Sequence, residues 1–351
     1  MPAPPTAAVE ATATPVFTPT AAPAPTAIPS STPALTDTPS ATPDPVISLA
    51  AVGDIMLARQ LGRRLEAGEA DYPFALVAES LRAADLAVGN LECAVGDQGV
   101  PLSKSYRFQA PPAAAEALAL AGFDLVTLAN NHAMDFGPDG LADTLRLLDA
   151  AGVAHVGAGA NAATARQPVV LERNGLRVAF LGYVDVPVER GGWDARSVIA
   201  GADSPGVAWA DLEEVAAGVS AARDQADVVV VLLHSGYEYQ DRPNAIQRAI
   251  GRAAIDAGAA LVIGAHSHTL QGVERYGGGL IVYSLGNFAF EIDQSRDSAI
   301  LQATLSRQGV QALDWLPVVL DPNDGRPAPA QGEARLRILA SLDRLSDELH
   351  P

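Results

Sequence analysis

The chain has 351 residues, of which 48% are hydrophobic and 18% charged, and this apolar content excludes a wholly disordered protein. Its formal net charge of −18 excludes a broad binding surface for nucleic acid or for an anionic membrane, because both require clustered Lys and Arg. An anionic substrate would therefore need a local positive centre, for which a bound divalent cation is the obvious candidate.

Residues 1–45 are a mixture of Pro, Thr and Ala with few charges and no apolar periodicity. This composition favours an extended, solvated linker. No segment of the chain resembles a signal peptide or a membrane span of about 20 apolar residues. Linkers of this kind usually separate a membrane anchor from an outside domain. We therefore expect an extracytoplasmic, cell-envelope protein with a signal or lipid anchor upstream.

Residues 46–321 are expected to form one α/β domain, followed by a loop and a C-terminal helix over 322–351. Within the domain, five segments share one pattern, a short apolar run that ends on Asp, Asn, Glu or His. They are residues 46–54, 85–92, 123–132, 227–234 and 259–268. Helical periodicity between them, ending at Gly152 and Gly258, predicts βαβ units with mostly parallel pairing.

The region 168–183 differs from these segments, because its two apolar runs flank Asn174 and Gly175. An Asn-Gly pair in this setting is a strong signal for a hairpin with a type I′ turn. Further β-rich sequence predicts either a second sheet or an antiparallel extension of the parallel one. It covers residues 280–283, 298–305 and 310–320.

Polar side chains at the ends of these strands are expected to meet in space, because ligands bind at the carboxyl ends of strands in open α/β sheets. The set combines imidazole, carboxylate and amide groups, which are ligands for Zn, Mn and Fe. His266 and His268 are two residues apart, so in extended backbone both imidazoles would face one cavity. The full set is Asp54, Asn90, Glu92, Asn130, Asn131, His132, Asp135, His234, His266 and His268.

Six short motifs follow one another through the folded part. They are Gly-Asp-Ile-Met at 53–56, Gly-Asn-Leu-Glu at 89–92, Asn-Asn-His at 130–132, His-Ser-Gly-Tyr-Glu at 234–238, Gly-Ala-His-Ser-His at 264–268 and Tyr-Ser-Leu-Gly-Asn-Phe at 283–288. In this order they resemble the CapA family of poly-γ-glutamate capsule biosynthesis proteins, from about residue 46 to 320. That family is similar to calcineurin-like metallophosphoesterases, so the resemblance implies a four-layer α/β/β/α sandwich with a dinuclear metal site.

The resemblance also implies a role for each metal ligand, with one or two divalent ions (Mn, Zn or Fe) as the cofactor. Asp54 would bind the first ion, Glu92 or Asn90 would bridge the two ions, and His268 would return to the first. The second ion would be held by Asn131, His234 and His266.

For the chemistry, the resemblance implies that His132 acts as general acid toward the leaving group and that Asp135 orients it. The chain also departs from the metallophosphoesterase pattern, which has Asp-x-His where this chain has Asp54, Ile55 and Met56. It likewise has Gly-Asn-Leu-Glu in place of Gly-Asp-x-x-Asp. Met56 is a poor ligand for a hard cation and is expected to pack in the core. One tightly held ion and a weaker second one are therefore expected.

Four further residues are candidates for substrate binding. Arg107 would offer a guanidinium fork to a carboxylate or phosphate, although a solvated surface position is the alternative. The other three lie within the motifs and are expected to line the cleft. They are Tyr237, Glu238 and Asn287.

These observations leave more than one function open. The first is a metal-dependent hydrolase of the CapA type that cleaves phosphoester or amide bonds in an acidic cell-envelope polymer. The second is a non-catalytic component that binds or exports the polymer together with other capsule-synthase subunits, which the Met56 departure favours. A nucleotidase or nuclease is a third, but the absence of a basic patch disfavours polynucleotide substrates.

Overall fold

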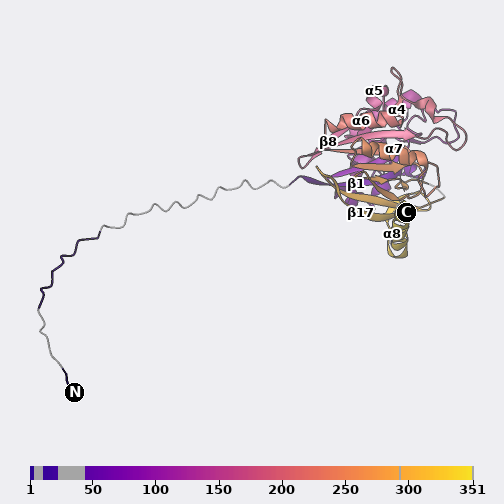
Figure 1. The fold of residues 1–351 in the computed structure, drawn as a ribbon. Coiled ribbons are helices and arrows are strands. Elements are labelled where there is room, and N and C mark those ends of the chain that lie inside the picture. The colour runs from indigo at the N-terminus through magenta and orange to yellow at the C-terminus, as the bar shows by residue number, and fades with distance from the viewer. Residues whose placement is uncertain (4–10, 23–43, 292–293, 350–351) are drawn as a thin grey trace. The chain divides into compact units, whose positions relative to one another are not determined.

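The computed structural model describes residues 1–3, 11–22, 44–291 and 294–349 (Figure 1). Contacts between residues divide the chain into Met1–Pro43 and a compact unit, Asp44–Pro351. The described residues of the first segment are exposed and form neither helix nor strand. Much of the linker predicted over 1–45 lies outside the described residues. No helix in the described part combines the length and apolarity needed to cross a membrane.

The first sheet of the compact unit has eight strands and is mixed. In spatial order its strands are β18 (Pro327–Pro329), β17 (Gly309–Leu320), β16 (Asp297–Ser306), β1 (Val46–Ile55), β2 (Leu86–Leu91), β5 (Leu125–Thr127) and β6 (Ala154–Val156), with β15 (Asn287–Ala289) also paired to β1. The pairs from β1 to β6 are parallel, whereas β16, β17 and β18 pair antiparallel. The predicted antiparallel extension is thus confirmed.

The second sheet has six strands, so the predicted second sheet is present as well. Their order is β13 (Val273–Tyr276), β14 (Gly279–Val282), β12 (Leu261–Ala265), β11 (Val228–Ser235), β9 (Leu176–Asp185) and β8 (Val169–Arg173). Strands β8 and β9 form the predicted hairpin, in which Asn174 and Gly175 both have positive φ, 51° and 79°. That backbone is what a type I′ turn requires.

The two sheets pack face to face through one apolar cluster. Alternate residues of β1, such as Ile47 and Leu49, meet alternate residues of β9, such as Val178 and Phe180. The intervening residues of each strand point outward, as the period of two requires. Ala50 of β1, for example, belongs to a different cluster, which packs the opposite face of its sheet.

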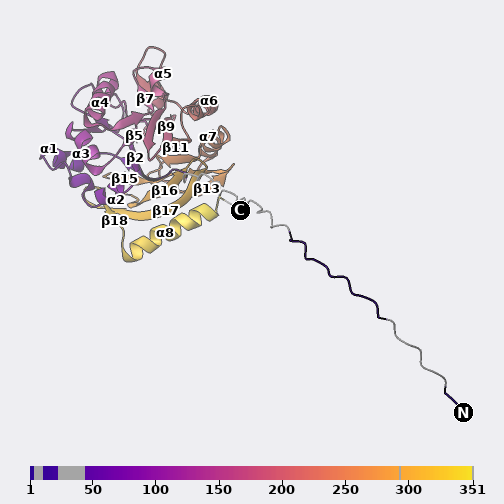
Figure 2. The ribbon, with the colours of Figure 1, turned by 90° about the vertical axis from the view of Figure 1, so that its left-hand side faces the viewer.

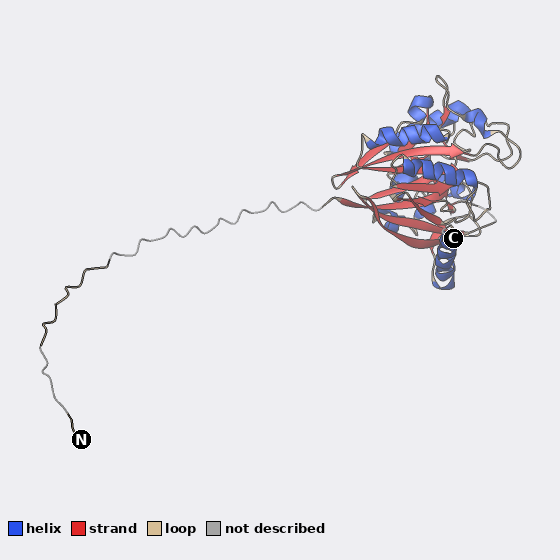
Figure 3. Ribbon diagram, in the orientation of Figure 1, coloured by secondary structure: helices blue, strands red, loops and turns tan. Residues whose placement is uncertain are grey.

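Helices cover the outer face of each sheet (Figures 2 and 3). The first sheet is covered by α1 (Arg59–Glu66), α2 (Ala78–Arg82), α3 (Ala113–Ala121) and α4 (Gly137–Ala151), and the second by α6 (Leu212–Arg223) and α7 (Ala245–Asp256). The layer order α/β/β/α is the one that the resemblance to calcineurin-like metallophosphoesterases predicted. The predicted C-terminal helix is present as α8 (Gly332–Asp347), which lies along β17 (Figure 2).

Shorter elements complete the fold. They are η1 (Tyr72–Phe74), β3 (Ala94–Val95), β4 (Gln109–Ala110), β7 (Ala158–Gly159), α5 (Ala162–Ala165), η2 (Ala195–Val198) and β10 (Gly206–Val207). Capping explains where two of the longer helices begin. Asp211 accepts hydrogen bonds from the first-turn amides of α6, and Asn244 forms a capping box with Gln247 at the start of α7. Such caps satisfy amides that have no partner within the helix.

A glycine allows the close backbone approach that positions the polar end of β1. A Cβ atom on Gly53 would lie 1.9 Å from the backbone oxygen of Gly286. Without a side chain at this position, the amide of Asp54 donates a 2.9 Å hydrogen bond to that oxygen. The neighbouring strands then align Asp54 with Asn90 of β2 and with Asn287 of β15.

Candidate metal centre

The polar strand ends predicted from the sequence come from both sheets. Asp54 and Asn90 lie at the ends of β1 and β2, and Glu92 directly follows β2. His234 is near the end of β11, and His266 directly follows β12. The predicted convergence is therefore correct, but it arises where two stacked sheets end together and not along the edge of a single parallel sheet.

Two clusters of buried side chains can each hold a metal ion. Asp54, Glu92 and His268 form one, and Glu92, His234 and His266 form the other. In each cluster the candidate ligand atoms lie within 4.8 Å of one another. Glu92 belongs to both, which is the bridging position that the resemblance implied for it. Asn131 adds an amide oxygen to the second cluster, 2.8 Å from Nε2 of His234.

The electrostatics of Glu92 fit a bound cation. Both of its carboxylate oxygens are buried, and neither has a hydrogen-bond partner in the described part of the chain. Burial, and after it the neighbouring Asp54 carboxylate, raise the pKa of Glu92 well above its usual value. A buried, unpaired carboxylate is unfavourable unless a positive charge compensates it, and a divalent cation would supply that charge.

The histidines of the second cluster are in the protonation state that metal binding needs. Burial and the neighbouring histidines lower the pKa values of His234 and His266 well below the usual range. Both imidazoles are therefore neutral at neutral pH, and a neutral imidazole is the form that ligates a metal. The buried Nδ1 of His266 has no hydrogen-bond partner among the described residues.

The backbone around His266 and His268 differs from the prediction. Strand β12 ends at Ala265, and both histidines have positive φ, 92° and 55°. The expected extended backbone is thus wrong, although the two rings still lie near each other, with centroids 6.0 Å apart. Positive φ is uncommon for residues other than glycine, and such backbone conformations are concentrated at functional sites.

Amide side chains hold the candidate ligands in place. The Nδ2 group of Asn90 donates to Oδ1 of Asp54 at 2.7 Å and lies 3.0 Å from Nδ1 of His234. This leaves Nε2 of His234 directed at Glu92 and Asn131. Asn90, itself predicted as a possible ligand, thus donates a hydrogen bond to Asp54 and contacts the ring of His234. Partners of this kind fix the orientation of metal ligands.

Asn287 plays the same part for His268. Its side-chain oxygen lies 2.8 Å from Nδ1 of His268, and the residue is fully buried. The structure therefore places Asn287 behind a histidine and not on the cleft surface expected from the sequence. Burial alone would lower the pKa of His268, but the carboxylate of Asp54 and the oxygen of Asn287 raise it.

His132 and Asp135 form the predicted pair beside the two clusters. The Nδ1 atom of His132 lies 2.8 Å from Oδ2 of Asp135, and the imidazole packs against the ring of Phe108 with centroids 4.3 Å apart and the planes tilted by 32°. Asp135 is fully buried and also accepts the backbone amide of Phe108 at 2.7 Å. When Nδ1 of His132 carries a proton, it donates that proton in a hydrogen bond to the Asp135 carboxylate. The other ring nitrogen, Nε2, is then free to contact a substrate.

Lys104 is a site residue that the sequence analysis missed. It is the single lysine of the chain, and its ammonium group is completely buried. The ammonium donates to Asp135 at 2.7 Å, to the backbone oxygen of Asn131 at 2.9 Å and to Glu189, and it lies over the ring of Trp193. Its uniqueness in a chain with many arginines was the one signal available in the sequence.

Glu189 connects this lysine to a candidate ligand. Its Oε1 atom accepts from Lys104 and also from the Nδ2 group of Asn131 at 3.0 Å. Because the nitrogen of the Asn131 amide is held by Glu189, its oxygen turns toward His234. Lys104 and Glu189 therefore set the orientation of Asn131.

A cleft of about 320 Å³ opens onto these groups and is lined by Asn131, His132 and His268. Two exposed arginines line it as well, Arg59 and Arg190. The guanidinium of Arg190 lies over the ring of Tyr239, at 5.7 Å from its centre. These two arginines were not predicted.

The four substrate-binding candidates are distributed unevenly. Glu238 lines the cleft, and it also lines an adjoining hollow of about 450 Å³ together with Tyr237, which is 67% exposed. Arg107 is exposed, donates to the backbone oxygen of Leu102 and lines a separate hollow beside Trp193. The structure thus brings Glu238 to the candidate centre, Tyr237 to its rim, and Arg107 to neither.

Comparison with known proteins identifies the family to which the chain belongs. The family model described as "Bacterial capsule synthesis protein PGA_cap" matches residues 48–292. The chain is 36% identical over 296 residues to the "PGA biosynthesis protein CapA" of Bacillus subtilis (strain 168), covering 83% of this chain and 76% of that protein. It is 34% identical over 293 residues to the "Capsule biosynthesis protein CapA" of Bacillus anthracis, covering 81% and 69%.

Among solved structures, a "novel phosphatase" of Mycoplasma pneumoniae is similar at 13% identity, with a TM-score of 0.47 over 80% of this chain and 95% of that one. The family match spans well over half of this chain, and it contains all the residues of both clusters. The chain belongs to the PGA_cap family of bacterial capsule synthesis proteins.

Proposed function

We propose that this protein is a metal-dependent hydrolase that acts on an acidic polymer of the cell envelope. The observation that carries the proposal is the buried Glu92 carboxylate, which has no hydrogen-bond partner in the described part of the chain and lies in both histidine–carboxylate clusters. Carboxylate, imidazole and amide ligands suit Mn, Zn or Fe. We expect one or two such ions, held by the clusters together with Asn131.

A bound divalent ion supplies Lewis-acid activation of water and stabilises developing negative charge. The other steps fall to side chains of the chain itself. As an imidazolium, His132 donates its Nε2 proton to the leaving group, while its Nδ1–H stays bound to Asp135, which orients the ring and stabilises its positive charge. Arg59 and Arg190, at the edge of the cleft, bind an anionic group of the substrate next to the bond that breaks.

The names of the relatives support the choice of polymer. The Bacillus subtilis relative is named for PGA biosynthesis and the Bacillus anthracis relative for capsule biosynthesis. We infer that the substrate of this chain is a polymer of the same acidic kind and that the protein works at the cell envelope beside other capsule-synthase subunits. Because the chain is strongly negative, the cation and the arginines of the cleft must offset repulsion of such a polymer.

Replacing His234 by Ala is expected to abolish metal-dependent hydrolysis and to lower the metal content of the purified protein. The matched control is His155→Ala, because His155 lies in β6, away from both clusters, and contacts Asp149. Each protein is loaded with Mn or Zn and assayed on γ-linked polyglutamate and on aryl phosphates, and its metal content is measured by elemental analysis. Equal hydrolysis by His234→Ala and the parent would remove the proposal.

A second function, polymer binding without catalysis, is favoured by Met56. This residue stands where metallophosphoesterases have a histidine ligand, and it is fully buried in the apolar core under α1 to α4. The first cluster therefore has one candidate ligand fewer than the corresponding site of metallophosphoesterases. Metal content separates the two functions, since a protein that keeps less than one ion per chain after loading supports the binding role.

A further inference from the structure

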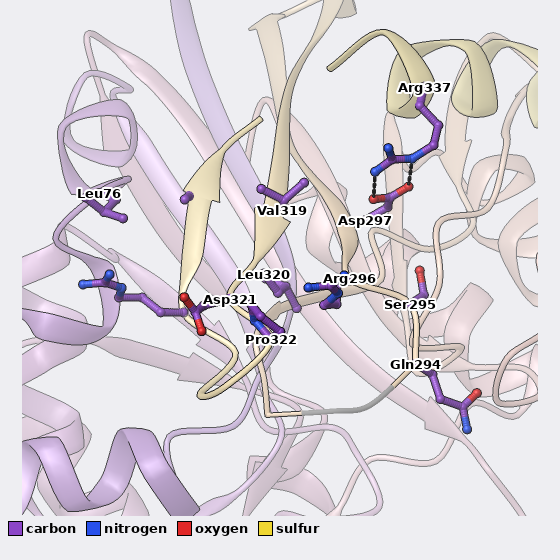
Figure 4. Close-up of a pocket in the computed structure, with 12 residues that line it drawn as sticks. Leu76, Gln294, Ser295, Arg296, Asp297, Val319, Leu320, Asp321, Pro322 and Arg337 are labelled. Atoms are coloured by element: carbon purple, nitrogen blue, oxygen red, sulfur yellow. Dashed lines mark hydrogen bonds and ion pairs between the residues drawn. The ribbon is translucent and has the colours of Figure 1, made fainter. Parts of the chain in front are cut away.

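A hollow of about 560 Å³ lies between the start of β16, the end of β17 and α8. Figure 4 shows Arg296 near its centre and the pair of Arg337 and Asp297 at its edge. Apolar side chains form much of the remaining lining. They are Leu76, Val319, Leu320, Pro322 and Ala328.

The three arginines of this hollow are not equally neutralised. Arg337 forms two hydrogen bonds to Asp297, at 3.0 and 2.6 Å. The guanidinium of Arg326 lies over the ring of Tyr72, and its buried Nε has no hydrogen-bond partner among the described residues. Arg296 is exposed and has no hydrogen bond or ion pair to its side chain within the part of the chain that the structure describes.

The described residues of the lining include two carboxylates, those of Asp297 and Asp321. Asp297 forms an ion pair with Arg337. Asp321 accepts hydrogen bonds from the backbone and side-chain nitrogens of Asn323. Within the described part of the chain, two of the guanidinium groups therefore have no carboxylate partner, in a protein whose net charge is −18. The described lining thus carries three guanidinium groups against two carboxylates, and this excess of one positive charge suits an anionic ligand.

The hollow and the metal cleft share a lining residue, Gln294. Gln294 lines the hollow, the cleft over His132 and His268, and the adjoining hollow that contains Tyr237. The hollow therefore borders the cleft at Gln294. The two sites can thus hold neighbouring segments of one polymer.

We propose that this hollow is a second subsite, which binds carboxylates of an acidic polymer whose neighbouring segment lies in the metal cleft. The proposal rests on the acidic polymer of the proposed function. Arg296 and Arg326 bind the carboxylates through paired N–H groups. The apolar lining around Leu320 packs against the methylene groups between carboxylates. The subsite thereby holds a long chain, whereas a ligand short enough to fit the cleft alone does not reach it.

Fluorescence anisotropy with a labelled γ-linked glutamate oligomer and a labelled glutamate dimer tests this subsite on the full chain. Arg296→Gln is expected to weaken binding of the oligomer about tenfold, the effect of losing a charged hydrogen bond, and to leave dimer binding unchanged. Arg296→Lys keeps the positive charge but not the two parallel N–H groups of the guanidinium. We therefore expect it to weaken oligomer binding less than Arg296→Gln does. The matched control is Arg335→Gln, which removes the same charge from an exposed position on α8 outside the hollow.

Equal weakening by Arg296→Gln and Arg335→Gln would mean general charge attraction and would overturn the subsite. Unchanged oligomer binding by Arg296→Gln would overturn it as well. Binding and cleavage separate this proposal from the proposed function. An oligomer that needs Arg296 for binding but is never cleaved supports the subsite and refutes the hydrolase. An oligomer cleaved with unchanged KM by Arg296→Gln refutes the subsite and leaves the hydrolase standing.

Discussion

Glu92→Gln is expected to remove metal binding from both clusters while making the metal-free protein more stable. The carboxylate is shared by the two clusters, and an amide of the same shape lacks the negative charge that both ions need. The metal content of the loaded protein, measured by elemental analysis, is expected to fall to background. The rate of hydrolysis is expected to fall with it. No other single substitution removes a ligand from both clusters.

The stability gain follows from the burial of Glu92. Its carboxyl pKa in the folded protein lies well above the ordinary value of 4.5, because burial and Asp54 disfavour the charged form. The folded state therefore holds this proton more tightly than the unfolded state, and stability falls as the pH rises above that ordinary value. Glutamine does not ionise, so the Tm of metal-free Glu92→Gln is expected to exceed that of the parent increasingly as the pH rises. Such a gain at the expense of function is common at active sites.

Glu238→Gln is the matched control, because Glu238 lines the same cleft and is in neither cluster. It is expected to keep the metal content of the parent. Thermal unfolding in the presence of a chelator, compared with unfolding after metal loading, measures the two effects separately. A Glu92→Gln protein that binds metal like the parent, or that is less stable than the parent when metal-free, would contradict this account of Glu92.

The strands and the hairpin were predictable because their signals are local. Apolar runs that end on polar residues, and an Asn-Gly pair between two such runs, each depend on neighbours within a few residues. The assignment of strands to sheets was not predictable in this way. The ends of β2 and β11 carry the same apolar pattern, yet the strands belong to different sheets. Only tertiary packing separates them.

The ligands of the candidate site were easier to predict than their supports. Asp54, Glu92 and His234 stand at strand ends and carry recognisable chemistry. Lys104 lies in a loop, and its partners Asp135 and Glu189 are 31 and 85 residues away in the sequence. Arg107 is in the same loop and was a candidate because its guanidinium fork suits a carboxylate or phosphate, but it lines another hollow. Contacts between distant loops leave no periodic trace in the sequence.

Lys104→Met is expected to lower the free energy of unfolding by about 3–5 kcal/mol, the usual effect of removing one partner from a buried ion pair. Its ammonium group is completely buried, and so is the Asp135 carboxylate that it contacts, while that of Glu189 is 5% exposed. Without the lysine, these two carboxylates stay buried with no cation. The double variant Lys104→Met, Glu189→Gln removes one of these charges and is expected to recover part of the loss.

The same substitution is expected to weaken metal binding at the second cluster. Lys104 donates to the backbone oxygen of Asn131 and holds Glu189, which in turn holds the Asn131 side chain. Loss of such a support typically lowers metal affinity about 10- to 100-fold. Calorimetric titration with Mn or Zn measures this affinity independently of activity. The titration is done at a temperature at which the variant is still folded.

Arg107→Met provides the matched control for both effects, because it removes one positive charge from the same loop at an exposed position. It is expected to change unfolding and metal affinity little, since exposed charges contribute little to stability. If Lys104→Met bound metal as tightly as Arg107→Met while losing stability, the lysine would hold the fold without positioning Asn131. If both variants were as stable as the parent, the buried ion pairs around Lys104 would not contribute to folding.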